Sequence, residues 1–419
     1  MKKLWIALMA ITALFCLTFA ACGEKDKGGD SEPEPVVTKY TVSIAVNNAD
    51  YGTVSQSNVA NVAKDTAITV SGNKITVGTT EITATPKEDD EEYIYSFEGF
   101  TGATAKVQSD LTITANFTRE DKVVDITDLC EDGVLGYVEK LSTATNQEIV
   151  LSDFVAEMVN SVENFKIGET DIPTTYDDTT KTITIATADF TYMISGEVVC
   201  SFDCGRKTFT TRLYVADYVL RTADDITNKY KPVGNVYFVF ASDIEGGTIS
   251  YEQGNFEGVI DGKGHVLKDA VITGGFGFIN ENVGGNADCV IKNIALVNLT
   301  GSDRDMLAYG ASTAKVENVY VSGTCGWSDL FECVYDGGLT VNNLIMNFHK
   351  LSTGTVHGIN DGGSGTVNQD NVINIHAMGE TEFFTTYAEG LGDEWDETPF
   401  SVDADGLYFF GKLILENNA

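Results

Sequence analysis

The 419-residue chain has little positive charge. It carries 27 Lys and Arg residues against 62 Asp and Glu, which gives a formal net charge of -35 at pH 7. Nucleic acid and anionic lipid headgroups would be repelled by this charge, so neither is expected as a partner. Acidity on this scale also keeps a large protein in solution. The negative charge alone therefore does not predict a cation site.

Cysteine and histidine are also scarce, and their spacing forms no metal-binding motif. No Cys-x-x-Cys pattern recurs, and the four histidines lack the spacing of zinc ligands. We therefore expect no metal and no other cofactor, and no motif supports a Ca²⁺ site. Six cysteines follow the N-terminal segment, and the sequence leaves open whether they pair or remain buried free thiols: Cys130, Cys200, Cys204, Cys289, Cys325 and Cys333.

Long apolar runs are absent except at the N-terminus. Lys2 and Lys3 precede an apolar run over residues 4–19. This run is shorter than the roughly 20 residues that a membrane-spanning helix needs. A basic start, a short apolar run and small residues at its end are typical of a secretory signal peptide, which we assign to residues 1–21.

The end of this segment, Phe19-Ala20-Ala21-Cys22, resembles the lipobox of bacterial lipoproteins. The resemblance implies cleavage before Cys22 and attachment of acyl chains to it, and two or more chains anchor a protein stably. Residues 22–37 are polar and rich in Gly and Pro, so we expect a flexible tether. The protein is then extracytoplasmic, anchored to a bacterial membrane and displayed at the cell surface. The alternative is an ordinary signal peptide with a chance cysteine.

About 400 mature residues are too many for one core, so several domains are expected. Residues 38–119 alternate apolar and polar positions in short runs, which predicts half-buried strands. The segments YTVSIAVNNADYGTVS, FEGFTG and DLTITANFTR resemble a divergent internalin-type B repeat. That resemblance implies a small β-rich spacer module of a bacterial surface protein.

Residues 123–221 contain further alternating runs, at 182–186, 198–202 and 209–215. Residues 151–162 differ, because their apolar side chains fall on one helical face. Strands at this spacing with one short helix favour an immunoglobulin-like sandwich, although the tryptophan and cysteine framework of true immunoglobulin domains is missing.

A repeat is visible from residue 222 to residue 380. Thr222 and Asp225 fit a capping box that starts a short helix, which could cover the end of the repeat region. The segments CVIKNIALV, AKVENVYVS, LTVNNLIMN and VNQDNVINI then share an asparagine at steps of 25, 25 and 28 residues. This period, with β-branched residues on both sides, predicts a right-handed parallel β-helix with one coil per repeat. The fold class is therefore all-β, with two small β-modules before the β-helix.

The segments FEGVIDGKGHVL, FGFIN and VIKNIALVN resemble the pectate-lyase-like β-helix superfamily, and within it surface proteins with degenerate glycine-rich repeats. The resemblance implies a fold more than a reaction, because members include lyases, hydrolases and adhesins. Asp261 lies in a turn like the IDGxG turn of polygalacturonase-like enzymes. The further acidic and basic motifs that such catalysis needs are missing, so we read Asp261 as a turn residue and assign no catalytic residue.

The shared asparagines are interpreted as a structural ladder, in which stacked amides bond from coil to coil. Sugar binding instead uses exposed aromatic rings and nearby polar groups. Trp327, Tyr309 and Tyr320 lie near coil edges, and Arg304 has nearby carboxylates, so these four are the candidate ligand-binding residues. Core packing is the alternative for each aromatic residue. The ladder residues are Asn293, Asn318, Asn343 and Asn371.

The C-terminal residues 381–419 are apolar enough to dock on the last coil as a cap, which a solenoid requires. Together these features favour a lipid-anchored surface protein that presents a non-catalytic β-helix for adhesion to a glycan or to another surface protein. A polysaccharide lyase or glycoside hydrolase of the β-helix class is the first alternative. A structural component of the cell envelope is the second.

Overall fold

The computed structural model describes residues 37–418 apart from 251, 276, 280, 303, 327, 328, 336, 351–357, 396 and 397. The side chains of 286–288, 350, 361 and 394 are not described either. The predicted signal peptide, Cys22, residues 22–36 of the predicted tether and Trp327 therefore lie outside the described residues. The described chain divides into two compact units, the first formed by residues up to 87 with 95–118 and the second by 88–94 with 119 onward.

The first unit contains two small sheets, as the alternating pattern of residues 38–119 predicts. One has the strand order β3-β1-β8-β7 and the other β2-β6-β5-β4. Alternate residues such as Val42, Ile75 and Ile113 are fully buried between them. The strands are β1 (Lys39–Val46), β2 (Gly52–Val54), β3 (Asn58–Ala63), β4 (Ile68–Ser71), β5 (Lys74–Val77), β6 (Thr80–Pro86), β7 (Tyr93–Thr101) and β8 (Leu111–Asp121).

The second unit begins with a module of two sheets around one core. The larger sheet has the order β10-β17-β16-β12-β13, with β9 also paired to β17, and the smaller has the order β11-β15-β14. Phe202 and Phe209 of the first sheet and Ile183 of the second are buried together. The predicted helix is present as α1 (Asp153–Met158), which buries Val155.

The strands of this module are β9 (Val123–Asp125), β10 (Tyr137–Glu139), β11 (Asn146–Val150), β12 (Glu163–Ile167), β13 (Thr170–Asp171), β14 (Thr174–Asp177), β15 (Thr182–Ala186), β16 (Gly196–Cys204) and β17 (Lys207–Ala216). Three short 3-10 helices accompany them: η1 (Thr127–Leu129), η2 (Glu131–Gly133) and η3 (Thr187–Asp189). All six cysteines at or beyond position 130 are free thiols in the structure. Cys200 and Cys204 lie on the single strand β16, so the chain does not turn between them as a bridge would require.

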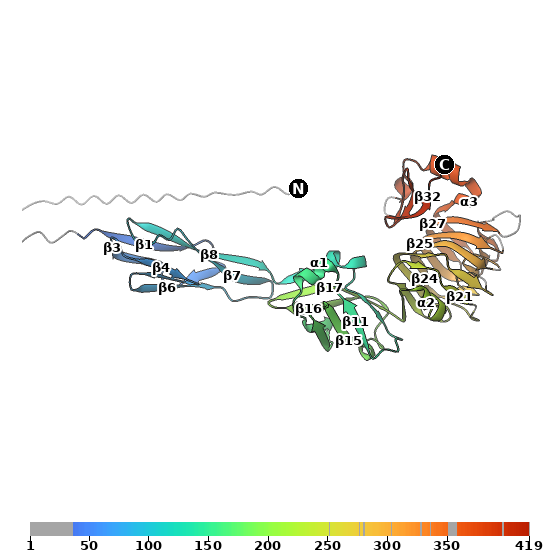
Figure 1. Cartoon of the computed structure of the whole chain (residues 1–419). Helices are drawn as coiled ribbons and strands as arrows, with labels where there is room; N and C mark the ends of the chain where they lie inside the picture. The colour runs from blue at the N-terminus through green and yellow to red at the C-terminus, as the bar shows by residue number, and fades with distance from the viewer. Residues whose placement is uncertain are drawn as a thin grey trace, which may run out of the picture. The chain divides into compact units, whose positions relative to one another are not determined.

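The rest of the second unit is a parallel β-solenoid of about five turns, which confirms the parallel β-helix architecture. Figure 1 shows β24, β25 and β27 lying one after another along it. Its elements are β18 (Tyr218–Leu220), α2 (Ala223–Asn228), β19 (Tyr237–Phe240), β20 (Ile244–Glu245), β21 (Thr248–Ser250), β22 (Val259–Lys268), β23 (Val271–Thr273), β24 (Asn282–Ser302), β25 (Ala308–Cys325), β26 (Asp329–Val334), β27 (Leu339–Lys350), β28 (Gly358–Gly362) and β29 (Val367–Asn374).

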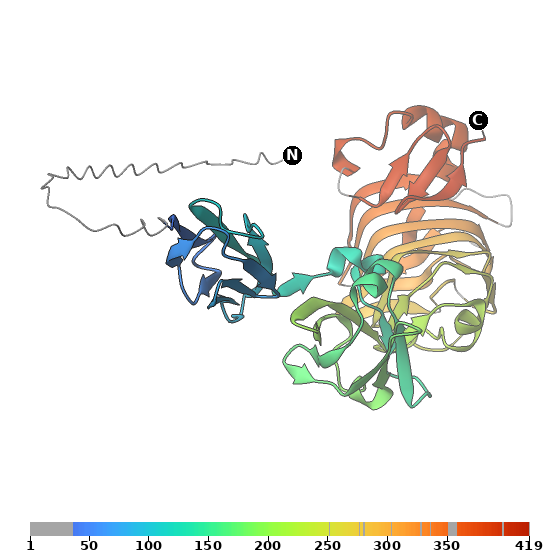
Figure 2. The same cartoon turned by 60° about the vertical axis from the view of Figure 1, so that its left-hand side comes forward.

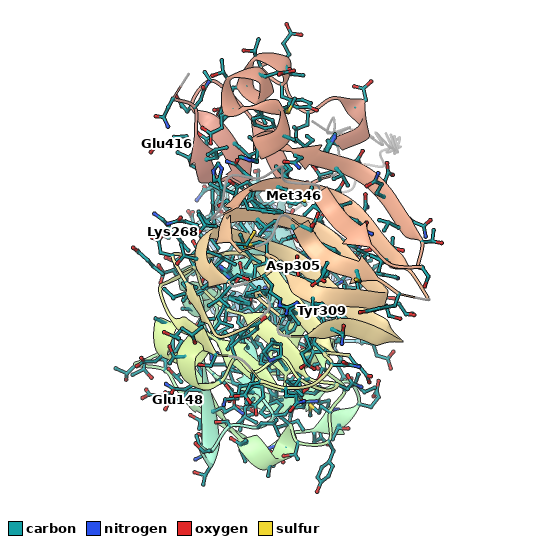
Figure 3. The ribbon with its side chains drawn as sticks, turned by 90° about the vertical axis from the view of Figure 1, so that its right-hand side faces the viewer. Glu148, Lys268, Asp305, Tyr309, Met346 and Glu416 are labelled. Atoms are coloured by element: carbon teal, nitrogen blue, oxygen red, sulfur yellow. The ribbon has the colours of Figure 1, made fainter. Side chains whose placement is uncertain are left out.

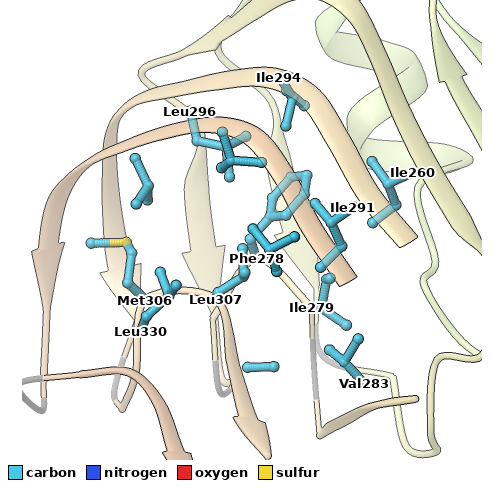
Figure 4. Close-up of a cluster of buried hydrophobic side chains, with 14 of the residues drawn as sticks. Ile260, Phe278, Ile279, Val283, Ile291, Ile294, Leu296, Met306, Leu307 and Leu330 are labelled. Carbon is cyan, nitrogen blue, oxygen red and sulfur yellow. The ribbon is translucent and has the colours of Figure 1, made fainter. Parts of the chain in front are cut away.

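The repeat predicted from the sequence sets the register of the coils. Ile291 of β24 pairs with Val316 of β25, which pairs with Val341 of β27. Their side chains fill the interior with those of Ile260, Phe278, Leu307 and other apolar residues (Figure 4). At the N-terminal end, Thr222 and Asp225 form the expected capping box of α2, and Ile226 of this helix is buried in the solenoid core.

The C-terminal segment contains α3 (Ile375–Met378), α4 (Glu380–Thr386), η4 (Asp393–Trp395), β30 (Phe400–Val402), β31 (Gly406–Phe409) and β32 (Lys412–Glu416). Figure 2 shows this segment in red against the solenoid. Phe383, Phe400 and Phe409 pack on Tyr320 and Ile345, which lie on the outside of successive coils. The segment therefore covers the outer wall of the coils as well as following the last one.

Candidate functional site

The four predicted asparagines form a continuous chain of side-chain hydrogen bonds. The Nδ2 of Asn318 donates to the Oδ1 of Asn293 at 2.9 Å, Asn343 donates to Asn318 at 2.8 Å, and Asn371 donates to Asn343 at 3.0 Å. All four have φ between 51° and 55°, the left-handed region that Asn tolerates better than most residues. The amides are thus used to hold the turn of each coil, as a structural ladder does.

The ladder starts at Asp261, the residue of the IDGxG-like turn. The Nδ2 of Asn293 lies 3.4 Å from the Oδ1 of Asp261, which also accepts from the backbone N–H of Lys263 at 3.0 Å. The Oδ2 of Asp261 accepts from the hydroxyl of Tyr214 at 2.6 Å and lies 3.3 Å from Lys292 Nζ. Only 2 % of Asp261 is exposed. Because its carboxylate is enclosed by these donors, the geometry is that of a turn residue and not of an acid that meets a substrate.

A second polar cluster lies beside this turn and was not foreseen from the sequence. The Nε2 of His265 is 3.1 Å from Asp132 Oδ2, and its Nδ1 is 3.3 Å from Asp243 Oδ1. Lys412 Nζ is 2.6 Å from Asp243 and 3.2 Å from His265 Nδ1. Burial opposes ionisation of Asp132, but its contacts with His265 and Tyr137 lower its pKa overall. No local sequence motif predicts the cluster, because its four residues come from four distant segments of the chain.

Two of the predicted ligand-binding residues do lie together, on the outside of the solenoid. The guanidinium carbon of Arg304 is 5.7 Å from the ring centre of Tyr309, and Arg304 also pairs with Glu332 at 3.3 Å. Tyr309 is partly exposed and sits between the buried Ala308 and Gly310 of β25, so its side chain points outward. Figure 3 labels Tyr309 on the solenoid.

Tyr335 completes this surface, and no sequence pattern had pointed to it. It is 38 % exposed, and burial together with a hydrogen bond to Tyr309 raises its pKa to about 12. A Cβ added to Gly310 would lie 2.5 Å from Tyr335 Cε2, so the ring rests directly on the glycine backbone. We call Arg304, Tyr309, Glu332 and Tyr335 the Tyr309 face. It combines two aromatic rings with a charged pair at the surface.

Tyr320 does not belong to this surface. It is 1 % exposed, because the C-terminal segment covers the side of the coils on which it lies. Its ring packs in the same cluster as Phe383 and Phe409. Tyr320 is therefore not an exposed aromatic ring, and core packing, the alternative, describes its position. Trp327 is outside the described residues.

A buried carboxyl group lies behind the Tyr309 face. Asp305 is fully buried, and neither of its side-chain oxygens has a hydrogen-bond partner. Burial, with the neighbouring charges of Glu332 and Asp329, raises the pKa of Asp305 to about 8. Asp305 is labelled in Figure 3. At neutral pH the acid is mostly protonated, because ionisation would leave an unpaired charge inside the protein.

Within residues 37–418, gaps excepted, no three His, Cys, Asp or Glu side chains are grouped to hold a metal ion. His349 and His376 are in edge-to-face contact, with ring centres 4.4 Å apart. No helix in the same residues is long and apolar enough to cross a membrane. The chain matches no protein-family model, and no curated protein or solved structure is significantly similar to it.

Proposed function

We propose that this chain is a bacterial surface lipoprotein that binds glycans on the Tyr309 face of its β-solenoid without cleaving them. One observation carries the proposal: Arg304, Tyr309, Glu332 and Tyr335, from successive coils, form one outward surface. Aromatic rings stack on the apolar faces of sugars, while a guanidinium and a carboxylate hydrogen-bond to hydroxyl groups. The same set provides both kinds of contact.

The N-terminal part of the proposal rests on the sequence. The lipobox-like residues before Cys22 support a lipid anchor, and residues 22–37 support a tether. Residues 38–119 then act as an internalin-type spacer that holds the solenoid away from the membrane. Labelling of cells with a radioactive fatty acid tests the anchor: the label is expected on the wild-type protein and absent from a Cys22→Ala variant. An equally labelled variant would reject it.

The burial of Asp261 supports binding over hydrolysis. Glycoside hydrolysis requires two carboxyl groups that reach opposite sides of the scissile bond. The carboxylate of Asp261 instead lies beneath Tyr214 and is bonded to the turn and to the ladder. With 2 % of Asp261 exposed, its carboxylate is not presented to a substrate at the surface.

The test is a glycan-array screen of the complete mature chain in its unlipidated form, followed by product analysis on every polysaccharide bound. We expect binding that falls about tenfold in Tyr335→Ala and in Arg304→Ala, since each removes one principal contact. Tyr192→Ala is the matched control, because Tyr192 is 95 % exposed on the preceding module. New reducing or unsaturated ends would instead establish an enzyme. Failure to bind any glycan would favour a structural role.

A further inference from the structure

The hairpin between β31 and β32 presents an aromatic side chain in an unfavourable backbone conformation. Phe410 has φ 47° and Gly411 has φ 75°, so both central residues of the turn have positive φ. Such turns favour Asn-Gly or Gly-Gly, and a bulky residue at the first position is strained. Phe409 is fully buried and anchors the hairpin, whereas Phe410 is 48 % exposed. The ring of Phe410 packs edge-on against Phe409, with ring centres 4.8 Å apart, and about half of the Phe410 side chain remains open to solvent.

Phe410 lines a surface hollow of about 410 Å³. The hollow brings together the preceding module, the turn of the first coils and the C-terminal hairpin. The ring of Phe410 lies against Gly264. A Cβ added to Gly264 would be 2.9 Å from Phe410 Cγ, so the ring can occupy this position only because residue 264 is a glycine. We call this hollow the Phe410 pocket, and it is lined by Asp132, Lys263, Gly264, Asn293, Phe410 and Lys412.

The charges of the Phe410 pocket are balanced by nearby partners. Lys263 Nζ is 2.9 Å from Glu197, and Lys412 Nζ is 2.6 Å from Asp243. Asp132 accepts hydrogen bonds at Oδ2 from Tyr137 and lies close to His265. An anionic ligand would meet the carboxylate of Asp132, and a cationic ligand would meet two ammonium groups. The electrostatics therefore favour a neutral ligand that can both donate and accept hydrogen bonds.

We propose that the Phe410 pocket binds one neutral hexose unit, as a second glycan site separate from the Tyr309 face. The C–H face of the sugar packs on the exposed ring of Phe410. Its hydroxyl groups donate to Asp132 and accept from Lys263 and Lys412. A side chain on a strained turn is held in a fixed direction, which lowers the entropy lost when the sugar binds. This site adds to the function proposed above and does not depend on the Tyr309 face.

Saturation-transfer NMR on the unlipidated mature chain tests this assignment. The probes are the methyl glycosides of glucose, galactose and mannose, with glucuronate as an acidic comparison. We expect saturation of the ring C–H protons of at least one neutral glycoside, and binding about tenfold weaker in Phe410→Ala. Phe410→Trp, which keeps an aromatic face, is expected to restore it. Thermal unfolding of each variant checks that the hairpin remains folded.

Tyr335→Ala separates the two sites, because it alters the Tyr309 face and leaves the Phe410 pocket intact. Hexose binding that persists in Tyr335→Ala and falls in Phe410→Ala supports the pocket. Binding that falls only in Tyr335→Ala would reject the pocket while retaining the function proposed for the Tyr309 face. Binding of glucuronate alone, or of none of the probes, would also overturn the pocket assignment.

Discussion

The hydroxyl of Tyr214 donates a 2.6 Å hydrogen bond to the carboxylate of Asp261. Tyr214 lies on β17 of the two-sheet module, whereas Asp261 lies on the first long strand of the solenoid and begins the asparagine ladder. Burial and the charge of Asp261 both raise the pKa of Tyr214 above its ordinary value. The phenol therefore remains a neutral donor, and the module and the ladder are joined through one buried carboxylate.

Replacing Tyr214 by phenylalanine should weaken this junction. In this variant the Oδ2 of Asp261, which is only 2 % exposed, loses its shortest hydrogen bond. Because a buried charged acceptor then lacks a donor, the free energy of unfolding should fall by about 1–3 kcal/mol. Denaturant unfolding followed by tyrosine fluorescence measures the loss. Tyr192→Phe is the control, because its hydroxyl is exposed and its removal should leave stability unchanged. Equal stability of the two variants would show that the Tyr214 bond contributes nothing.

The asparagine ladder predicts that Asn318→Ala and Asn318→Gly lower the stability of the protein by different amounts. Asn318 both donates to Asn293 and accepts from Asn343, and its φ is 54°. Asn318→Ala loses both bonds and places a Cβ in the left-handed region, for a combined loss of about 2–4 kcal/mol. Asn318→Gly loses the same bonds without the backbone strain and should be less destabilised. Urea denaturation of the two variants provides the comparison, and equal losses would contradict the role assigned to the backbone.

Asp305 predicts that stability falls as pH rises. Its pKa in the folded protein is about 8, above the roughly 3.9 of an unfolded chain, so between these values the folded state binds more protons. Stability is therefore highest below about pH 4 as far as this group is concerned, and is lost as pH rises toward and through 8. Asp305→Asn removes the ionisable group and should raise Tm most at alkaline pH.

Scanning calorimetry from about pH 5 to pH 9 measures this dependence on Asp305. The wild-type Tm should decline across the range more steeply than that of Asp305→Asn. Asp405→Asn serves as the matched control, since Asp405 is exposed and should leave the slope as it is. Parallel profiles for the wild type and Asp305→Asn would show that Asp305 does not keep its proton at neutral pH.

Gly310→Ala should disturb the Tyr309 face without removing any of its side chains. The added Cβ would lie 2.5 Å from both Tyr335 Cε2 and Asn282 Oδ1, so the ring must move. We expect a loss of stability of about 1–3 kcal/mol, typical of overpacking, and weaker glycan binding. Gly362→Ala is the matched control, because its nearest neighbour would be 3.8 Å away. Unchanged binding by Gly310→Ala would mean that the position of Tyr335 is not important.

The coil period, the fold class and the positions of the ladder could be predicted from the amino-acid sequence. The asparagines at steps of 25, 25 and 28 residues predicted a parallel solenoid, because each coil repeats the same turn and the same inward-facing positions. The capping box at Thr222 and the helix near Phe154 were also visible, since capping and helical periodicity depend on residues only a few positions apart. These features are local or regularly repeated.

Which outer side of each coil is covered could not be predicted, because it depends on how the C-terminal segment packs. Tyr309 and Tyr320 both lie on β25 outside the solenoid core, yet one is partly exposed and the other is buried beneath the C-terminal segment. A periodic pattern separates inward from outward positions but does not say which outer face another segment will cover. The Phe410 pocket, likewise, joins Asp132 to Lys412 across most of the second unit. Such sites depend on how distant segments pack together, and the spacing of residues along the chain does not predict that packing.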